Sequence, residues 1–354
     1  MKAREAHFQG KLMLFQTRHA KTQVFAETRQ GFKSFYRKRK TLLLIVYNME
    51  NKLKKTKNKK QKTIRTFFIL ISPWIIGFCM FTLCPIVASL ILGFTDAKVA
   101  TITTKPLNFI GVWNYVHVIT EDTIFLRSIG NTFYYAIVRV LVGTVLSVLL
   151  AVFFNREIKG KGIFRTMIYA PSLMPVVASA LVFKILLVSD GNIAVSFLQI
   201  LGLGEVDFIS EKNAMGTVIF IALINGIGPN MIVILAALQS VPKELEEAAT
   251  MDGAGKTRVF FNIVLPFISS SLMFVTLTGF ISALQVYASI SLFTGGGPNY
   301  ATITMGMQIV ANAFALDSFG MGYACAQAWI LFVIVLAFTM IYYRLMIKKV
   351  YFGD

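Results

Sequence analysis

The sequence contains, at residues 266–293, the stretch PFISSSLMFVTLTGFISALQVYASISLF, in which no side chain is charged. The charge-free run around it extends from Arg258 to Asp317 and is divided by the turn signal GGGP at residues 295–298. A helix needs about 20 apolar residues to cross a bilayer, so this stretch is long enough for one span. We therefore expect a membrane-spanning helix over about 266–293.

Five further windows share this apolar and nearly charge-free character. Their approximate bounds are 66–95, 132–154, 166–188, 213–240 and 319–343. The composition agrees, because 56% of the 354 residues are hydrophobic and only 15% are charged, whereas soluble domains carry roughly a quarter charged residues. The sequence therefore predicts an all-α polytopic membrane protein with six transmembrane helices between residues 66 and 350, and it excludes a water-soluble globule.

Cysteine and histidine give no sign of a covalent scaffold or a metal centre. All three cysteines, Cys79, Cys84 and Cys325, lie inside apolar stretches, and the three histidines are scattered along the chain. This usage argues against a disulfide framework and against a cysteine zinc site. We expect no metal site and no catalytic residue.

The net charge of +18 is concentrated in the first 65 residues, which hold 19 of the 35 Lys and Arg and 3 of the 17 acids. A lysine-rich segment before a span contacts anionic lipid and sets orientation, so we read it as a membrane-facing tail and expect no nucleic-acid partner. The loops that six spans would place on the tail's side are also the more basic ones. The prediction is a multi-pass cell-membrane protein with both termini cytoplasmic.

We expect residues 1–65 to form a basic, disordered cytoplasmic tail. Its first part, residues 1–48, has only a short apolar patch that could not cross a bilayer, whereas Met49 opens the basic sequence MENKLKK. Translation from Met49 is therefore an open alternative for the true start of the chain.

One polar loop, at residues 241–266, has strong local character. Pro242 suits a helix start, and Glu244, Glu246 and Glu247 follow in the first turns, where acidic side chains complement the helix dipole. Glycines follow at 253 and 255. We expect a short amphipathic helix, a glycine bend, and a second short helix leading into the fifth span.

This loop resembles the EAA loop of permease subunits of binding-protein-dependent ATP-binding cassette (ABC) importers. Glu-Ala-Ala at 247–249, Gly253, Ile263 and Leu-Pro at 265–266 match every fixed position of that signature. The resemblance extends over about residues 66–350 and implies the type I ABC importer permease fold. The coupling residues that it implies are Glu244, Glu247, Ala248, Ala249, Asp252, Gly253, Ile263, Leu265 and Pro266.

The resemblance also implies a set of partners. They are a second homologous permease, two cytoplasmic ATP-binding subunits and an extracellular solute-binding protein. Residues 253–257 end like a phosphate-binding loop, but that motif requires a glycine where Thr250 stands. We therefore expect no cofactor in this chain, with ATP bound and hydrolysed by the partner subunits, and the chain itself is not an enzyme.

Several shorter motifs are similar to the carbohydrate, maltose-type branch of these permeases. They are PWIIGF at 73–78, NFIG at 108–111, GNT at 130–132 and TGGGP at 294–298. This similarity implies a sugar or oligosaccharide as cargo. A peptide or amino acid stays open as another cargo, and a secondary transporter as another class, although a secondary transporter should carry ion-coupling acids within its spans.

Polar residues of the fourth and fifth spans are the candidate sugar contacts, because a hydroxyl-rich ligand needs amide and hydroxyl partners. In the fourth span, Asn225 and Asn230 flank the sequence GIGP at 226–229, where we expect a helix break. The candidates are Asn225, Asn230, Gly279, Ser282, Gln285 and Tyr287. We expect Asn225 and Gln285 to face one cavity, and interhelical hydrogen bonding is the alternative role of each polar residue.

Two charges lie near the apolar spans, Arg139 in the second and Lys184 in the third. A charge within a span is a candidate functional residue, and this alternative stays open for both. We favour structural roles, with Lys184 snorkelling to the membrane surface and Arg139 pairing within the bundle or reaching lipid headgroups. The neighbouring aromatic residues at 133–135 are interpreted as part of an interfacial belt.

Overall fold

The computed structural model describes residues 66–98, 106–188, 196, 199–200, 207–314, 320–348 and 350. The regular elements of that part of the chain are helices, with one isolated bridge between Thr95 and Phe109. The all-helical class expected from the sequence is therefore confirmed. The tail at residues 1–65, with the alternative start at Met49, lies outside the described residues.

The chain divides into two compact units, Met1–Cys84 and Pro85–Asp354. A helix over Thr66–Leu92 includes the π-helical turn η1 (Cys79–Leu83) and ends with α2 (Cys84–Leu92). The other long helices are α4 (Thr123–Asn155), α8 (Ala214–Gln239), α12 (Ser269–Leu284) and α15 (Met321–Ile347). The shorter elements are α3 (Trp113–Thr120), α5 (Lys161–Tyr169), η2 (Ala170–Leu173), α6 (Val176–Leu187), α9 (Lys243–Met251), α10 (Lys256–Val259), η3 (Phe260–Val264), α11 (Leu265–Phe267), α13 (Ala288–Phe293) and α14 (Met305–Phe314).

Four described helices are long and apolar enough to cross a membrane, namely Thr66–Leu92, α4, α8 and α15. Two bent pairs pass the same test, Lys161–Leu173 with Val176–Leu187 and Lys256–Phe267 with Ser269–Leu284. The described chain therefore has six spans if each bent pair is counted as one. Helix α4 begins nine residues before the expected start at 132, because Asp122 caps it by accepting a 2.8 Å bond from the Phe125 amide.

The third and fifth spans are bent, a feature that their expected bounds of 166–188 and 266–293 did not specify. The third is bent by 101° between η2 and α6, where Pro175 takes an extended conformation. A proline cannot donate the backbone bond that would continue a helix, so the bend lies where the sequence placed Pro171 and Pro175. The fifth is bent by 67°, ends at Leu284, and is followed by the separate helix α13. An apolar window locates a span in the sequence but fixes neither its ends nor its direction.

The expected break at residues 226–229 is wrong. Helix α8 runs without interruption from Ala214 to Gln239, with Pro229 inside it. A proline in a spanning helix removes one backbone bond, and contacts with neighbouring helices can offset that loss. Here Gly228 lies against the end of α5, since an added Cβ would be 2.6 Å from the Ile168 carbonyl oxygen.

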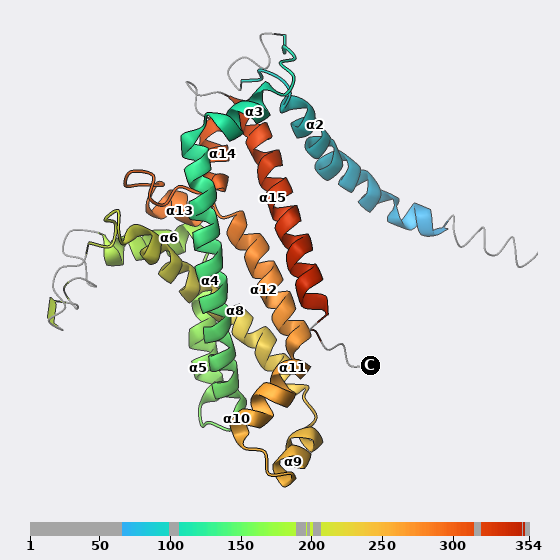
Figure 1. Cartoon of the computed structure of the whole chain (residues 1–354), viewed down its shortest axis with the longest axis vertical. Coiled ribbons are helices and arrows are strands. Elements are labelled where there is room, and N and C mark those ends of the chain that lie inside the picture. The colour runs from blue at the N-terminus through green and yellow to red at the C-terminus, as the bar shows by residue number, and fades with distance from the viewer. Residues whose placement is uncertain are drawn as a thin grey trace, which may run out of the picture. The chain divides into compact units, whose positions relative to one another are not determined.

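Two clusters of buried apolar residues hold the second unit together. One includes Tyr135, Phe280 and Leu284 and joins α4, α6, α8, α12 and α15. The other includes Phe154, Met231 and Val264 and joins α4 and α8 to the segment 259–268. Figure 1 shows α4, α12 and α15 side by side, with α9 and α10 at the end of this bundle opposite α3.

The α3 end of the bundle is braced by hydrogen bonds between distant segments. The Oδ2 atom of Asp122 accepts bonds from the Tyr323 hydroxyl at 2.9 Å and from Gln327 Nε2 at 3.1 Å. Gln327 in turn accepts a 3.0 Å bond from Asn312 of α14. These contacts connect the beginning of α4 to α14 and α15.

Candidate functional site

The loop between α8 and α12 folds as a helix, a bend and a second helix. Pro242 precedes α9 in an extended conformation, and Glu244 and Glu246 lie in its first turn. Helix α10 then leads through η3 into the fifth span. This order matches the amphipathic helix, glycine bend and second short helix that the residue types predict.

The end of α9 depends on Gly253. Its φ of +82° is in the left-handed region, which glycine adopts without the penalty that a Cβ would bring. The Gly253 amide donates to the Thr250 carbonyl at 3.0 Å, and the Ala254 amide donates to the Ala249 carbonyl at 3.0 Å. These two bonds form a Schellman cap. An added Cβ at Gly253 would meet nothing within 4 Å, so glycine is needed there for its backbone conformation rather than for space.

One side of the loop packs onto the bundle. Ala249, Ala254, Ile263 and Leu265 are partly buried against the cluster that includes Val264 and Met231 of α8. Four of the residues that the EAA resemblance singles out or adjoins therefore face inward. Ala249 thereby places the end of α9 against the cluster that α8 and the start of the fifth span share.

The other side of the loop is exposed. Met251 is 89% exposed and Leu245 is 45% exposed, and Glu247, Ala248 and Asp252 are also exposed. These two apolar side chains stand among charged neighbours on the same short helix. Helix α9 thus presents a small mixed surface, apolar and acidic, at the tip of the bundle (Figure 1).

A cavity of about 350 Å³ lies between α4, α6, α8 and the α12–α13 segment. This volume is in the range of pockets for small organic ligands. Asn225, Ser282 and Gln285 all line it, so the two amides expected to share a cavity do so. The remaining polar lining residues are Tyr135, Arg139, Ser172, Ser179 and Ser289.

Asn225 also makes an interhelical contact. Its Nδ2 atom donates to the Ser179 hydroxyl of α6 at 3.0 Å and to the Ile221 carbonyl at 3.0 Å. The side chain therefore combines both roles considered from the sequence, since it joins α6 to α8 and lines the cavity. Ser179, which sequence reasoning did not select, is fixed at the cavity wall by this contact.

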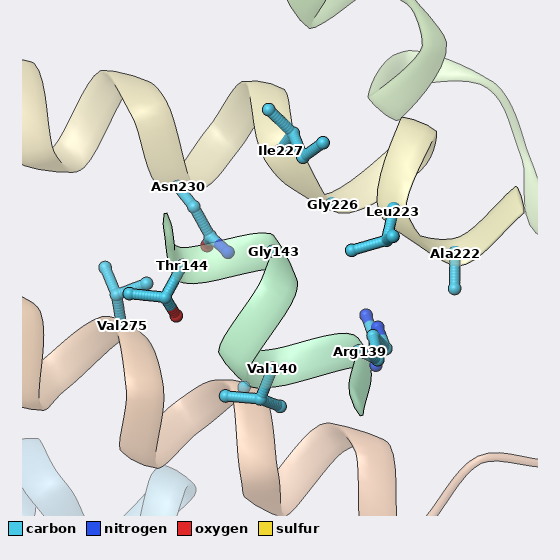
Figure 2. Close-up of a pocket in the computed structure, with 11 residues that line it drawn as sticks. Arg139, Val140, Gly143, Thr144, Ala222, Leu223, Gly226, Ile227, Asn230 and Val275 are labelled. Carbon is cyan, nitrogen blue, oxygen red and sulfur yellow. The ribbon is translucent and has the colours of Figure 1, made fainter. Parts of the chain in front are cut away.

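A second, narrow cavity of about 30 Å³ adjoins the first and shares Arg139, Ala222 and Gly226 with it. It has room for only about two water molecules. Asn230 and Gly279 line this narrow cavity instead of the larger one, and Tyr287 lines neither. Figure 2 shows Asn230 of α8 pointing toward Gly143 and Thr144 of α4.

Two residues interpreted as structural belong to the cavity walls. Tyr135 is 1% exposed and lies in the apolar core, not in an interfacial belt. Arg139 lines both cavities, and its guanidinium carbon is 5.8 Å from the centre of the Tyr135 ring. The signal that could have identified them is their spacing, because residues four apart share one face of a helix.

Known proteins share this sequence and fold. Residues 143–350 match the family described as "Binding-protein-dependent transport system inner membrane component". A protein of Bacillus subtilis (strain 168) named "Probable ABC transporter permease protein YesP" is 32% identical over 81% of this chain and 93% of its own length. The arabinooligosaccharides transport system permease protein of Halalkalibacterium halodurans is 28% identical over 85% of this chain and 96% of its own.

A third relative and a solved structure extend this likeness. The trehalose/maltose transport system permease protein of Thermococcus litoralis is 29% identical over 84% of this chain and 98% of its own. A chain of a bacterial ABC transporter involved in the import of the acidic polysaccharide alginate superposes with a TM-score of 0.70, at 21% identity, over 82% of this chain and 98% of that one. The structural likeness shows that both chains share the same fold.

Proposed function

This chain belongs to the family of binding-protein-dependent transport system inner membrane components, and we propose that it is the permease subunit of an ATP-driven ABC importer for a sugar or oligosaccharide. It forms half of the translocation pore and takes its cargo from an extracellular solute-binding protein. The other half is a second homologous permease. This chain carries out no covalent reaction.

The observation that carries the proposal is the construction of the 241–266 loop. Ala249 of α9 packs on the cluster formed by α4, α8 and the segment 259–268, while Met251 and acidic residues of α9 are exposed. A helix held in this way can transmit the movement of a bound partner into the bundle. The proposed partners are two cytoplasmic ATP-binding subunits, which hydrolyse ATP outside this chain.

The transport cycle follows from this connection. When ATP closes the two ATP-binding subunits, α9 moves with the subunit on which it docks. The contacts of Ala249 and Leu265 pass that displacement to α8 and the fifth span. These helices line the cavity of about 350 Å³, so their movement changes the side of the membrane to which the cavity opens. This is alternating access around a site within the bundle.

The sugar cargo is supported by two observations. Relatives with similarity over more than four fifths of this chain are named for arabinooligosaccharide and for trehalose and maltose transport. The cavity offers hydroxyl and amide groups from Ser179, Ser282, Gln285 and Asn225 beside apolar walls. Such groups match the hydroxyls of a saccharide.

Orientation follows from the proposed partner. Since the ATP-binding subunits are cytoplasmic, the α9 end of the bundle is the cytoplasmic end, and the α3 end faces outward. The basic tail and the carboxyl terminus then lie in the cytoplasm, in agreement with the positive-inside rule.

Affinity purification tests the proposal. The full-length chain, tagged and expressed from its native locus, should retain a second permease and an ATPase in mild detergent. A saccharide should be found bound to the solute-binding protein that stimulates this complex. Recovery of the chain as a lone homo-oligomer that transports without ATP would contradict the proposal.

A further inference from the structure

Arg139 is placed at the centre of a spanning helix. Helix α4 extends over Thr123–Asn155, so sixteen of its residues precede Arg139 and sixteen follow it. Both cavities have Arg139 in their wall, at the point where they adjoin. Figure 2 shows the side chain beside Ala222 of α8, at the edge of the narrow cavity.

The surroundings of Arg139 contain no carboxylate from the described part of this chain. The residues that line the two cavities are apolar or carry hydroxyl, amide and phenol groups, and Arg139 is the charged group among them. The described acids lie outside the spans, in loops, in helix caps and on α9. Arg139 makes a cation–π contact with Tyr135, since its guanidinium carbon lies 5.8 Å from the centre of that ring.

A guanidinium stays charged in proteins, so Arg139 cannot avoid this environment by losing its proton. A charge at membrane depth is costly, and such residues are usually paired or line a pathway for a charged solute. The Tyr135 ring orients the guanidinium, and the cation–π contact offsets part of the energetic cost of the charge at membrane depth. An aromatic ring carries no net negative charge, however, so it does not neutralise Arg139. The position therefore favours an anionic group in the cavity.

We propose that the cargo of this pore is an anionic saccharide, and that Arg139 binds its carboxylate or phosphate group. This inference rests on the proposed function and narrows the substrate class of the same site. Two parallel N–H donors of the guanidinium match the two oxygens of a carboxylate or phosphate. Ser282 and Gln285, on the same cavity, remain for the sugar hydroxyls.

Protection of Arg139 from phenylglyoxal, which modifies free guanidinium groups, tests the assignment directly. The intact complex is treated alone, with digalacturonate, with glucose 6-phosphate, or with the neutral dimethyl ester of digalacturonate, and the modified arginines are read by mass spectrometry. We expect at least one of the two anions to slow modification of Arg139 severalfold, while the ester has no effect. The exposed Arg156 is the internal control and should react equally in every sample.

Each other outcome of this experiment contradicts the proposal. Equal protection by the ester would show that charge is irrelevant, and lack of protection by both anions would show that Arg139 binds neither group. No modification of Arg139 in the ligand-free complex would show that its guanidinium is not free to bind a ligand in the cavity. The relative effect of digalacturonate and glucose 6-phosphate distinguishes a carboxylate site from a phosphate site.

A second experiment measures the uptake of acidic and neutral oligosaccharides by cells that express the complex. Arg139→Gln should lose uptake of the anionic cargo at least tenfold, and Arg139→Lys should retain part of it, while both variants copurify with the paired permease. The matched control is Lys184→Gln, which removes an exposed charge of α6 that lines neither cavity. Import of neutral saccharides alone would leave the proposed function intact and overturn the assignment of Arg139. Import of no saccharide, with ATP-dependent uptake of another solute, would overturn the proposed function.

Discussion

The amide nitrogen of Ala254 donates a 3.0 Å hydrogen bond to the carbonyl oxygen of Ala249, and this bond closes the end of α9. The chain can make it only because Gly253, between them, adopts a φ of +82°. Ala249 and Ala254 are also the two residues by which this end of α9 packs on the bundle. The cap therefore sets the angle at which the exposed face of α9 meets a partner.

Gly253→Asp should leave the protein in the membrane but impair coupling. Asp adopts the left-handed region less readily than Gly, so the substitution weakens the cap of α9 without unfolding the protein. We expect cargo-stimulated ATP hydrolysis by the complex to fall to near its basal rate. Gly255→Ala is the matched control, because Gly255 has a φ of −68° and open space around it. Equal behaviour of the two variants would argue against a role of the bend.

Glu247→Lys should weaken binding of the ATP-binding subunit. Glu247 is on the exposed face of α9, and reversing its charge should place a like charge against the partner at a cost of about tenfold in affinity or more. Binding is measured with the permease pair in nanodiscs and the purified ATPase. Glu157→Lys reverses an exposed charge in the α4–α5 loop and should bind normally. The same loss for both variants would assign the effect to net charge alone.

Gly228→Ala should destabilise the fold by about 1–3 kcal/mol, the usual cost of overpacking. Its Cβ would be 2.6 Å from the Ile168 carbonyl oxygen and 2.8 Å from the Tyr169 Cα, and both are backbone atoms that cannot turn away. The measurement is the thermal unfolding midpoint in detergent. Gly216→Ala, in the same helix with nothing within 4 Å, should not lower that midpoint. Unchanged stability of Gly228→Ala would show that α5 and α8 are farther apart.

Asp122→Ala should lower the free energy of unfolding by about 3 kcal/mol, since it removes a helix cap and bonds to a charged acceptor. The cap is the 2.8 Å bond from the Phe125 amide, and the other donors are Tyr323 and Gln327. Tyr323→Phe removes a smaller part of this network and should cost less. A larger loss for Tyr323→Phe than for Asp122→Ala would contradict the central position of Asp122.

Asn225→Ala and Gln285→Ala should each raise the cargo concentration for half-maximal transport about fivefold, the equivalent of one hydrogen bond. Both line the larger cavity. Gln239→Ala, at the exposed end of the same helix as Asn225, should not change this concentration. Unchanged transport kinetics in the Asn225→Ala, Gln285→Ala double variant would indicate that the paired permease supplies the cargo contacts.

The sequence is sufficient for the features that depend on local chemistry. Apolar windows identify the long helices, and Pro242 and Gly253 predict both ends of α9. The bends of 101° and 67° could not be predicted, because they depend on how each half of a span packs on its neighbours. The uninterrupted course of α8 through Pro229 has the same cause.

The cavity residues, too, could be predicted in type but not in spatial arrangement. Asn225 and Gln285 could be selected by residue type, but the cavity that both line is formed by α4, α6, α8 and the α12–α13 segment, which are far apart in the sequence. Arg139 was visible as a charge within an apolar window. Whether it had a carboxylate partner depended on residues distant in sequence, which only the structure brings into view.

The most direct test of the transport account is ATP hydrolysis by the complete complex in proteoliposomes, with its solute-binding protein added with and without bound saccharide. The account predicts a severalfold higher rate of ATP hydrolysis with the loaded binding protein than with the empty one. It also predicts that the saccharide appears on the side of the membrane opposite the binding protein. Hydrolysis that does not respond to the loaded protein, or saccharide uptake that continues without ATP, would contradict it.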